Sequence, residues 1–145
     1  MNTREAARQN FIPLMRELVR TYQVFSAYDA AGYRDAGLTV PQADVIFTLG
    51  NTGGLTFGEI GHKTLITKGT LTGVVKRLER KGLVYCTQSD EDRRCVRVQL
   101  SAKGMAVFRK EFPRQIQYLK SRFERLSSSQ QRAALKALRQ LREIF

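Results

Sequence analysis

The chain has 145 residues, of which 42% are hydrophobic, and it carries a formal net charge of +12. This size and composition predict one folded domain, and the excess of basic residues points to an acidic partner, with nucleic acid the first candidate. The sequence has no apolar run of about 18 residues that could span a membrane, and its polar first residues lack a signal core, so we expect a cytoplasmic protein.

The N-terminal part is expected to be helical. We expect residues 3–31 to be helical because apolar side chains recur at helical spacing from Phe11 onward, and Pro13 either opens the main helix at its first turn or kinks it. A loop follows over residues 32–37, and a second helix is predicted over residues 41–50, before a turn at residues 51–54. The apolar positions of the first helix are Phe11, Leu14, Met15, Leu18, Tyr22 and Phe25.

The next segment predicts a helix-turn-helix. A short helix over residues 56–63 and a tight turn over residues 64–66 lead to a second helix. We expect this helix to begin at Thr67, whose hydroxyl would cap an early backbone N–H, and to end before Gly82 as a left-handed C-cap. Its apolar stripe consists of Leu71, Val74, Val75 and Leu78. The opposite face is cationic, which is typical of a helix that lies in a groove of a polyanion.

A β-hairpin is predicted directly after this helix. Residues 83–88 and 95–100 alternate and are rich in β-branched side chains, and the polar residues 89–94 suit a hairpin tip. A helix-turn-helix followed by a hairpin is a winged helix. Cys86 and Cys95 could lie opposite one another, either as a redox-sensitive disulfide or as reduced thiols. Two cysteines and one histidine are too few for a structural zinc site, so we expect no metal and no cofactor.

The C-terminal part is expected to form two further helices. Ser101 can cap a helix over residues 102–125, which Pro113 should kink, and residues 127–129 restart a final helix. Residues 101–145 hold 11 basic and 3 acidic side chains. Each of these charges alone is expected to lie on a solvated helix face, and together they produce a positive field that attracts DNA. The apolar stripes of the first and last helices predict a homodimer; a monomer that packs these helices on its own core is the alternative.

Five segments in order, at matching spacing, resemble the MarR family of winged-helix transcription regulators. These segments are Pro41–Ile46, Lys68–Thr72, Val75–Val84, Asp90–Arg94 and Val98–Gly104. The resemblance implies a mainly α fold with a small β wing, in a single domain of residues 1–145. Residues 39–100 would form the winged helix-turn-helix lobe, and residues 1–36 and 101–145 would supply dimerisation helices from both termini.

The resemblance also implies an obligate dimer that binds a near-palindromic operator in double-stranded DNA. The implied major-groove residues are Thr67, Lys68, Gly69, Thr70, Thr72, Gly73, Lys76 and Arg77. Arg94 would enter the minor groove at the wing tip, with Asp92 orienting it. Arg93 and Arg97 would contact phosphates, which set register and salt dependence rather than sequence preference.

Gly73 departs from the family pattern, which often has a long polar side chain at this position. A glycine inside a helix costs about 1 kcal/mol relative to alanine. Gly73 either allows the helix backbone to approach DNA closely, or it reflects neutral drift while Thr70, Thr72 and Lys76 read the bases.

By the same resemblance, a small aromatic or carboxylate effector would bind between the dimerisation helices and the DNA-binding lobe. The aromatic side chains that could line this pocket, or else form plain core, are Tyr22, Phe25, Tyr28, Phe47 and Phe108. No nucleophile with a nearby base and no phosphate-binding loop is recognisable, so we expect no enzyme. The predicted function is a sequence-specific DNA-binding transcriptional regulator, a homodimeric repressor relieved by a small effector. The alternative is a winged-helix module that binds proteins, or binds nucleic acid without sequence preference.

Overall fold

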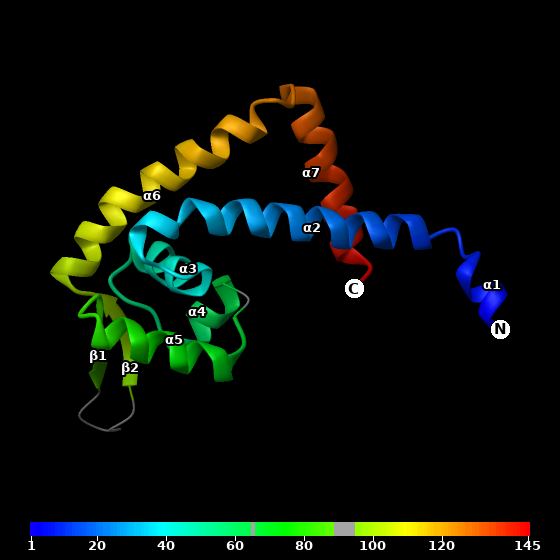
Figure 1. The fold of residues 1–145 in the computed structure, drawn as a ribbon. Helices are drawn as coiled ribbons and strands as arrows, with labels where there is room; N and C mark the ends of the chain where they lie inside the picture. The colour runs from blue at the N-terminus through cyan, green and yellow to red at the C-terminus, as the bar shows by residue number, and fades with distance from the viewer. Residues whose placement is uncertain (65, 89–94) are drawn as a thin grey trace. The chain divides into compact units, whose positions relative to one another are not determined.

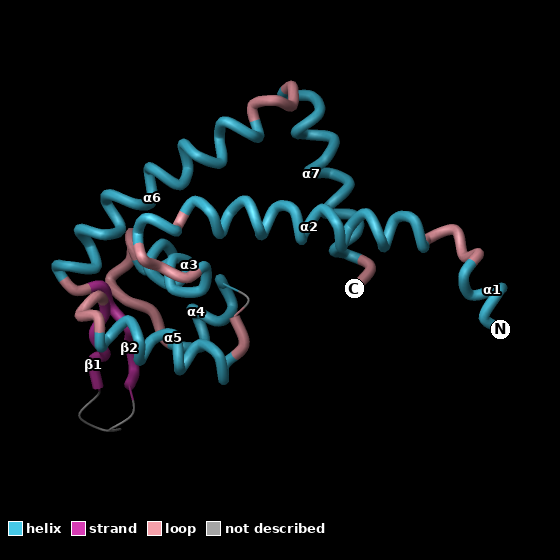
Figure 2. The backbone as a smooth tube through the Cα atoms, in the orientation of Figure 1, coloured by secondary structure: helices cyan, strands magenta, loops and turns pink. Residues whose placement is uncertain are grey.

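Most of the chain is helical in the computed structural model, which describes residues 1–64, 66–88 and 95–145 (Figures 1 and 2). The chain forms two compact units, Met1–Val40 and Pro41–Phe145. None of the helices in the described ranges is long and apolar enough to cross a lipid bilayer.

The first unit begins with a short helix, α1 (Thr3–Ala7), that has its own cap. The Asn2 side chain accepts a hydrogen bond from the Glu5 backbone N–H, and the Glu5 carboxylate accepts one from the Asn2 backbone N–H, both at 2.9 Å. This reciprocal pair is a capping box, which satisfies backbone donors at a helix start.

A break at residues 8–11 separates α1 from α2 (Ile12–Gly32), so the segment that was predicted to be helical, residues 3–31, consists of two helices. Pro13 lies in the first turn of α2, where its missing N–H and fixed φ are tolerated. This position confirms that Pro13 opens the main helix. After α2, a 3-10 turn, η1 (Arg34–Ala36), ends at Gly37 with φ of +64°, a left-handed conformation that glycine adopts without a Cβ penalty.

Three helices of the second unit precede the wing, and the last two of them form the helix-turn-helix. They are α3 (Val40–Leu49), α4 (Phe57–Thr64) and α5 (Lys68–Arg80), and α5 packs against α4. The largest fully buried side chains of this unit are Ile46, Leu49, Ile60, Leu71, Leu78, Val45, Val75 and Val98. The predicted apolar stripe of α5 is buried, which confirms that this helix points its cationic side away from the core.

The wing is an antiparallel pair of strands, β1 (Val84–Gln88) and β2 (Cys95–Leu100). Leu55 adds a bridge to β2: its backbone N–H donates to the Val98 carbonyl at 3.0 Å and its carbonyl accepts from the Val98 N–H at 2.8 Å. Cys86 pairs with Val98, whereas Cys95 pairs with Gln88, next to an irregularity in the register. The expectation that the two cysteines lie opposite one another is therefore wrong. Their redox role stays a prediction.

Two long helices follow the wing. α6 (Ala102–Phe123) is capped by Ser101, whose hydroxyl accepts from the Gly104 backbone N–H at 3.0 Å, as expected. Pro113 lies inside α6, and a kink there stays a prediction. α7 (Ser128–Glu143) begins with a capping box between Ser127 and Gln130.

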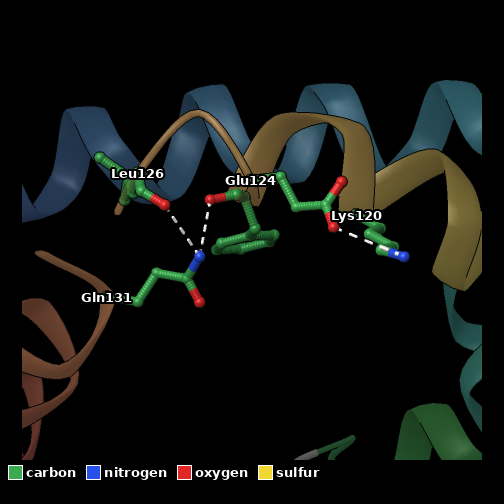
Figure 3. Close-up of polar contacts among 5 residues, drawn as sticks. Lys120, Glu124, Leu126 and Gln131 are labelled. Carbon is green, nitrogen blue, oxygen red and sulfur yellow. Dashed lines mark hydrogen bonds and ion pairs between the residues drawn. The ribbon is translucent and has the colours of Figure 1, made fainter. Parts of the chain in front are cut away.

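The corner between α6 and α7 is held by one side-chain amide (Figure 3). Gln131 donates to the carbonyl oxygens of Phe123 and Leu126, both at 3.0 Å. The Phe123 carbonyl also accepts from the Leu126 backbone N–H at 3.1 Å, so the Gln131 amide adds a second bond there and links the end of α6 to α7. Lys120 and Glu124 form an ion pair of 3.4 Å on the last turns of α6.

A mainly helical chain with a two-stranded wing confirms the predicted fold class.

Candidate nucleic-acid interface

The helix that precedes the candidate recognition helix is fixed at its start by a capping box that the sequence reasoning missed. The Thr56 backbone N–H donates to the Glu59 carboxylate at 2.8 Å, and the Glu59 N–H donates to the Thr56 hydroxyl at 3.2 Å. The Thr56 N–H holds the pKa of Glu59 below its ordinary value, with further lowering from Arg97 and Lys63. The spacing Thr-x-x-Glu was the available signal.

The turn between α4 and α5 is stabilised by a side chain. The Thr64 hydroxyl donates to the Ile60 carbonyl at 2.8 Å and accepts from the Ile66 backbone N–H at 3.3 Å. The turn passes close to Gly61: a Cβ there would lie 3.5 Å from the Ile66 carbonyl oxygen. These contacts link Ile66, two residues before α5, to α4.

α5 has one face in the core and the other in solvent. The buried face is apolar and packs against α4 and β1. The remaining face carries the residues implied for the major groove, all of them exposed except the half-buried Gly73: Thr67, Lys68, Gly69, Thr70, Thr72, Gly73, Lys76 and Arg77. The structure therefore brings eight of the twelve implied DNA-binding residues onto one side of one helix. A solvent-facing cationic helix of this kind can enter the major groove of duplex DNA.

The hydroxyl groups at the start of α5 are used differently from the prediction. Thr67 occupies the N-cap position, but its hydroxyl donates to the Thr70 hydroxyl at 3.0 Å instead of accepting from a backbone N–H of the described helix. Thr67 is therefore the N-cap residue, as predicted, but the predicted cap bond to a backbone N–H is not formed. The Thr70 hydroxyl accepts this bond and keeps its own hydrogen to donate outward.

The wing contributes one described residue of the implied set. Arg97 lies exposed on β2, and its Nη1 donates to the Gly54 carbonyl at 2.7 Å. This bond ties the wing to the turn before α4, so Arg97 has a structural role beside the implied phosphate contact. Asp92, Arg93 and Arg94 lie outside the described residues.

Two of the five aromatic side chains implied for an effector pocket come together in the second unit. The rings of Phe47 and Phe108 have centroids 6.3 Å apart, and Phe112 lies 5.2 Å from both. Phe108 also fills the space beside Gly50, where a Cβ would overlap its ring. Tyr22, Phe25 and Tyr28 lie on α2 in the other compact unit, and their place in a pocket stays a prediction.

A pocket of about 300 Å³ opens between α3 and α4. It is lined by Asp44, Phe47, Thr48, Lys63 and Thr64, of which only Phe47 was predicted. Its polar residues carry no pattern in the sequence, because they come from two helices whose packing brings them together. Among the described residues, no three His, Cys, Asp or Glu side chains are placed to hold a metal ion.

Comparisons of the sequence with known proteins agree with a winged helix-turn-helix. The MarR family profile matches residues 38–96. The uncharacterized HTH-type transcriptional regulator YfiV of Bacillus subtilis is 32% identical over 110 residues, which cover 76% of this chain and 69% of YfiV.

Solved structures give the same result over nearly the full length. Bordetella bronchiseptica BpsR, whose DNA binding is regulated by 6-hydroxynicotinic acid, has a TM-score of 0.80 and 28% identity, covering 89% of this chain and 98% of BpsR. The Mycobacterium tuberculosis MarR family protein Rv2887, in complex with p-aminosalicylic acid, has a TM-score of 0.67 and 26% identity, covering 89% of this chain and 98% of that one.

Proposed function

The chain belongs to the MarR family of HTH-type transcriptional regulators, and we propose that it binds a near-palindromic DNA operator as a homodimer. The observation that carries this proposal is the exposed cationic face of α5 opposite a fully apolar buried face. Each subunit would place α5 in the major groove, with the wing beside it. Two such helices related by two-fold symmetry match the two halves of a palindromic site. We expect this activity in the cytoplasm.

The exposed apolar side chains outside the winged helix support the homodimer. The exposed apolar side chains of α2 and its N-cap residue are Phe11, Leu14, Leu18, Val19, Tyr22 and Val24. Those of α6, α7 and the last two residues are Ile116, Phe123, Leu135, Leu138, Ile144 and Phe145. Helices that expose this many large apolar side chains are typical of subunit interfaces, where a partner would cover them. The predicted dimerisation segments, residues 1–36 and 101–145, are where this surface lies.

A small carboxylate effector would fit the pocket between α3 and α4. Lys63 can supply a positive charge for a carboxylate, and Phe47 can pack on an aromatic ring. BpsR and Rv2887 are relatives whose ligands, 6-hydroxynicotinic acid and p-aminosalicylic acid, combine these two groups. An effector that favours a dimer with the wrong spacing of its two α5 helices would release the operator, which is the action of a relieved repressor.

The role of α5 is tested by Lys76→Ala, with Lys136→Ala on α7 as the matched control. Operators are first obtained by selection from random duplexes. Loss of a groove contact should weaken operator binding about tenfold or more, because one good base contact is worth about 1–3 kcal/mol. The control removes the same charge from a helix outside the winged helix, so it should change affinity about twofold at most. Equal effects of the two changes would show that α5 acts through charge alone.

The effector pocket is tested with 6-hydroxynicotinate and p-aminosalicylate as probes. Binding of either probe should raise the melting temperature of the unmodified protein and lower its affinity for the operator. Lys63→Gln should remove both effects. Lys110→Gln should keep them, because it removes an exposed charge from α6 and leaves its buried partner Glu111 paired with Arg114. The same melting shift in Lys63→Gln would contradict a carboxylate site at this pocket.

A further inference from the structure

The end of α5 is tied directly to the start of α6. Three consecutive carbonyl groups follow the last turn of α5, those of Lys81, Gly82 and Leu83, and each accepts a hydrogen bond from the first residues around α6. The Ser101 backbone N–H donates to the Leu83 carbonyl at 3.0 Å, which continues the pairing of the two wing strands. The other two bonds come from side chains.

Ser101 makes one of these side-chain bonds and caps α6 at the same time. Its hydroxyl donates to the Gly82 carbonyl at 2.6 Å while accepting from the Gly104 N–H at 3.0 Å. The Lys103 ammonium donates to the Lys81 carbonyl at 2.9 Å. These carbonyls lie at the C-terminal end of α5, where partners within the helix run out and the helix dipole favours a positive charge.

The backbone at this joint is close-packed and has a fixed course. Gly82 has φ of +70°, and its N–H and that of Leu83 close the end of α5 on Glu79 and Leu78 at 2.8 and 2.9 Å. Gly104 packs so tightly that a Cβ would overlap the Leu83 carbonyl oxygen. A rotation of α5 relative to α6 therefore cannot occur without breaking the bonds made by Ser101 and Lys103.

We propose that Ser101 and Lys103 are positioning residues for DNA binding, which set the direction of α5 by bonding its terminal carbonyls to α6. This inference rests on the proposed function, in which the exposed face of α5 contacts the operator. A misdirected α5 loses contacts to base edges but keeps the charges that attract phosphates. The two residues thus act on the preference for the operator over random DNA, without touching DNA themselves.

Replacing Ser101 by aspartate separates its two hydrogen bonds. Aspartate accepts from the Gly104 N–H and keeps α6 capped, but an ionised carboxylate has no hydrogen to donate to the Gly82 carbonyl. Ser101→Asp should lower operator affinity about tenfold, because the bond to the Gly82 carbonyl is lost and the carboxylate repels that carbonyl oxygen. The affinity for random duplexes should change little. Ser101→Thr keeps donor and acceptor and should bind the operator like the unmodified protein. Ala102→Asp is the matched charge control, since it adds the same charge at an exposed neighbouring position.

Lys103→Met tests the second bond independently of the cap of α6. We expect about a fivefold loss of operator affinity, with the slope of log affinity against log salt unchanged. Lys103→Arg, which keeps a donor, should restore the affinity. Lys110→Met is the control for loss of one exposed charge on the same helix, and it leaves the buried Glu111 paired with Arg114.

Several results would overturn the positioning role. One is operator binding within twofold of the unmodified protein for both Ser101→Asp and Lys103→Met. A second is an equal loss in Ala102→Asp, which would assign the effect to charge. A third is a fall of the salt slope by about 0.9 in Lys103→Met, the value for one lost phosphate contact. Absence of any operator preference in the unmodified protein is a different outcome, because it would refute the proposed function itself.

Discussion

Replacing Gly73 by alanine should stabilise the protein and weaken its binding to DNA at the same time. A glycine inside a helix costs about 1 kcal/mol relative to alanine. Among the described atoms, an added Cβ would meet only the end of the Arg77 side chain, with Nη2 at 3.4 Å and Cζ at 3.9 Å. This flexible group can move aside, so the fold itself gives no reason for a glycine at this position.

The gain in stability should therefore be close to the full propensity difference, about 1 kcal/mol, or about 3 °C in melting temperature for a domain of this size. The loss in binding follows if the α5 backbone approaches the groove at Gly73. A methyl group inserted into a close-packed contact costs about 1–3 kcal/mol, which corresponds to a loss of about tenfold or more in operator affinity. Binding to random duplexes depends mainly on phosphates and should change little.

The assay combines urea unfolding with fluorescence anisotropy on a selected operator and a random duplex. Gly58→Ala is the control, because Gly58 lies in α4 and its nearest neighbour would be the Thr56 hydroxyl at 3.9 Å. This control should leave operator affinity unchanged. A more stable Gly73→Ala protein that binds the operator as tightly as the original would refute close backbone approach and leave neutral drift as the reason for the glycine.

Three further changes test the supporting structure. Thr56→Ala should lower the free energy of unfolding by about 1 kcal/mol in urea titrations, because α4 loses its hydroxyl cap; an unchanged midpoint would contradict the cap. Glu59 has a lowered pKa, chiefly through the Thr56 N–H, so its charge stabilises the fold above pH 4.5 and this stability is lost as the pH falls further. Glu59→Gln keeps the hydrogen bond without the charge, so the melting temperature of this variant should fall less on acidification below pH 4.5 than that of the unmodified protein. An equally steep fall in both proteins would refute this assignment. Phe108→Ala should cost about 3 kcal/mol, because Phe108 packs on Phe47, Phe112 and Gly50; a loss below about 1 kcal/mol would show that the cluster contributes little.

The sequence predicts the elements of the winged helix because their signals are local. The spacing of Leu71, Val74, Val75 and Leu78 fixes which side of α5 is buried, and the exposed groove residues follow from it. Gly82 is recognisable as a C-cap because its φ of +70° is a conformation that favours glycine. These features depend on neighbours within a few residues, which the sequence shows directly.

The features that the sequence does not predict depend on competing partners or on packing. The apolar stripe begins only at Phe11, so helical periodicity gives no information about the break at residues 8–11. The sequence identifies Thr67 as the N-cap residue, but it does not show that the Thr67 hydroxyl donates to Thr70 and makes no cap bond. The bond from Arg97 to Gly54 and the pocket around Lys63 join residues far apart in the chain. No periodic pattern encodes such contacts.

The central claim is that this protein distinguishes one duplex sequence from others through the exposed face of α5. The most direct test is the ratio of dissociation constants for a selected operator and a random duplex, measured at one physiological salt concentration. The account predicts a ratio of about 10³ or more, as is typical of specific DNA-binding proteins. A ratio below about tenfold would contradict it, because phosphate contacts alone would then explain the binding.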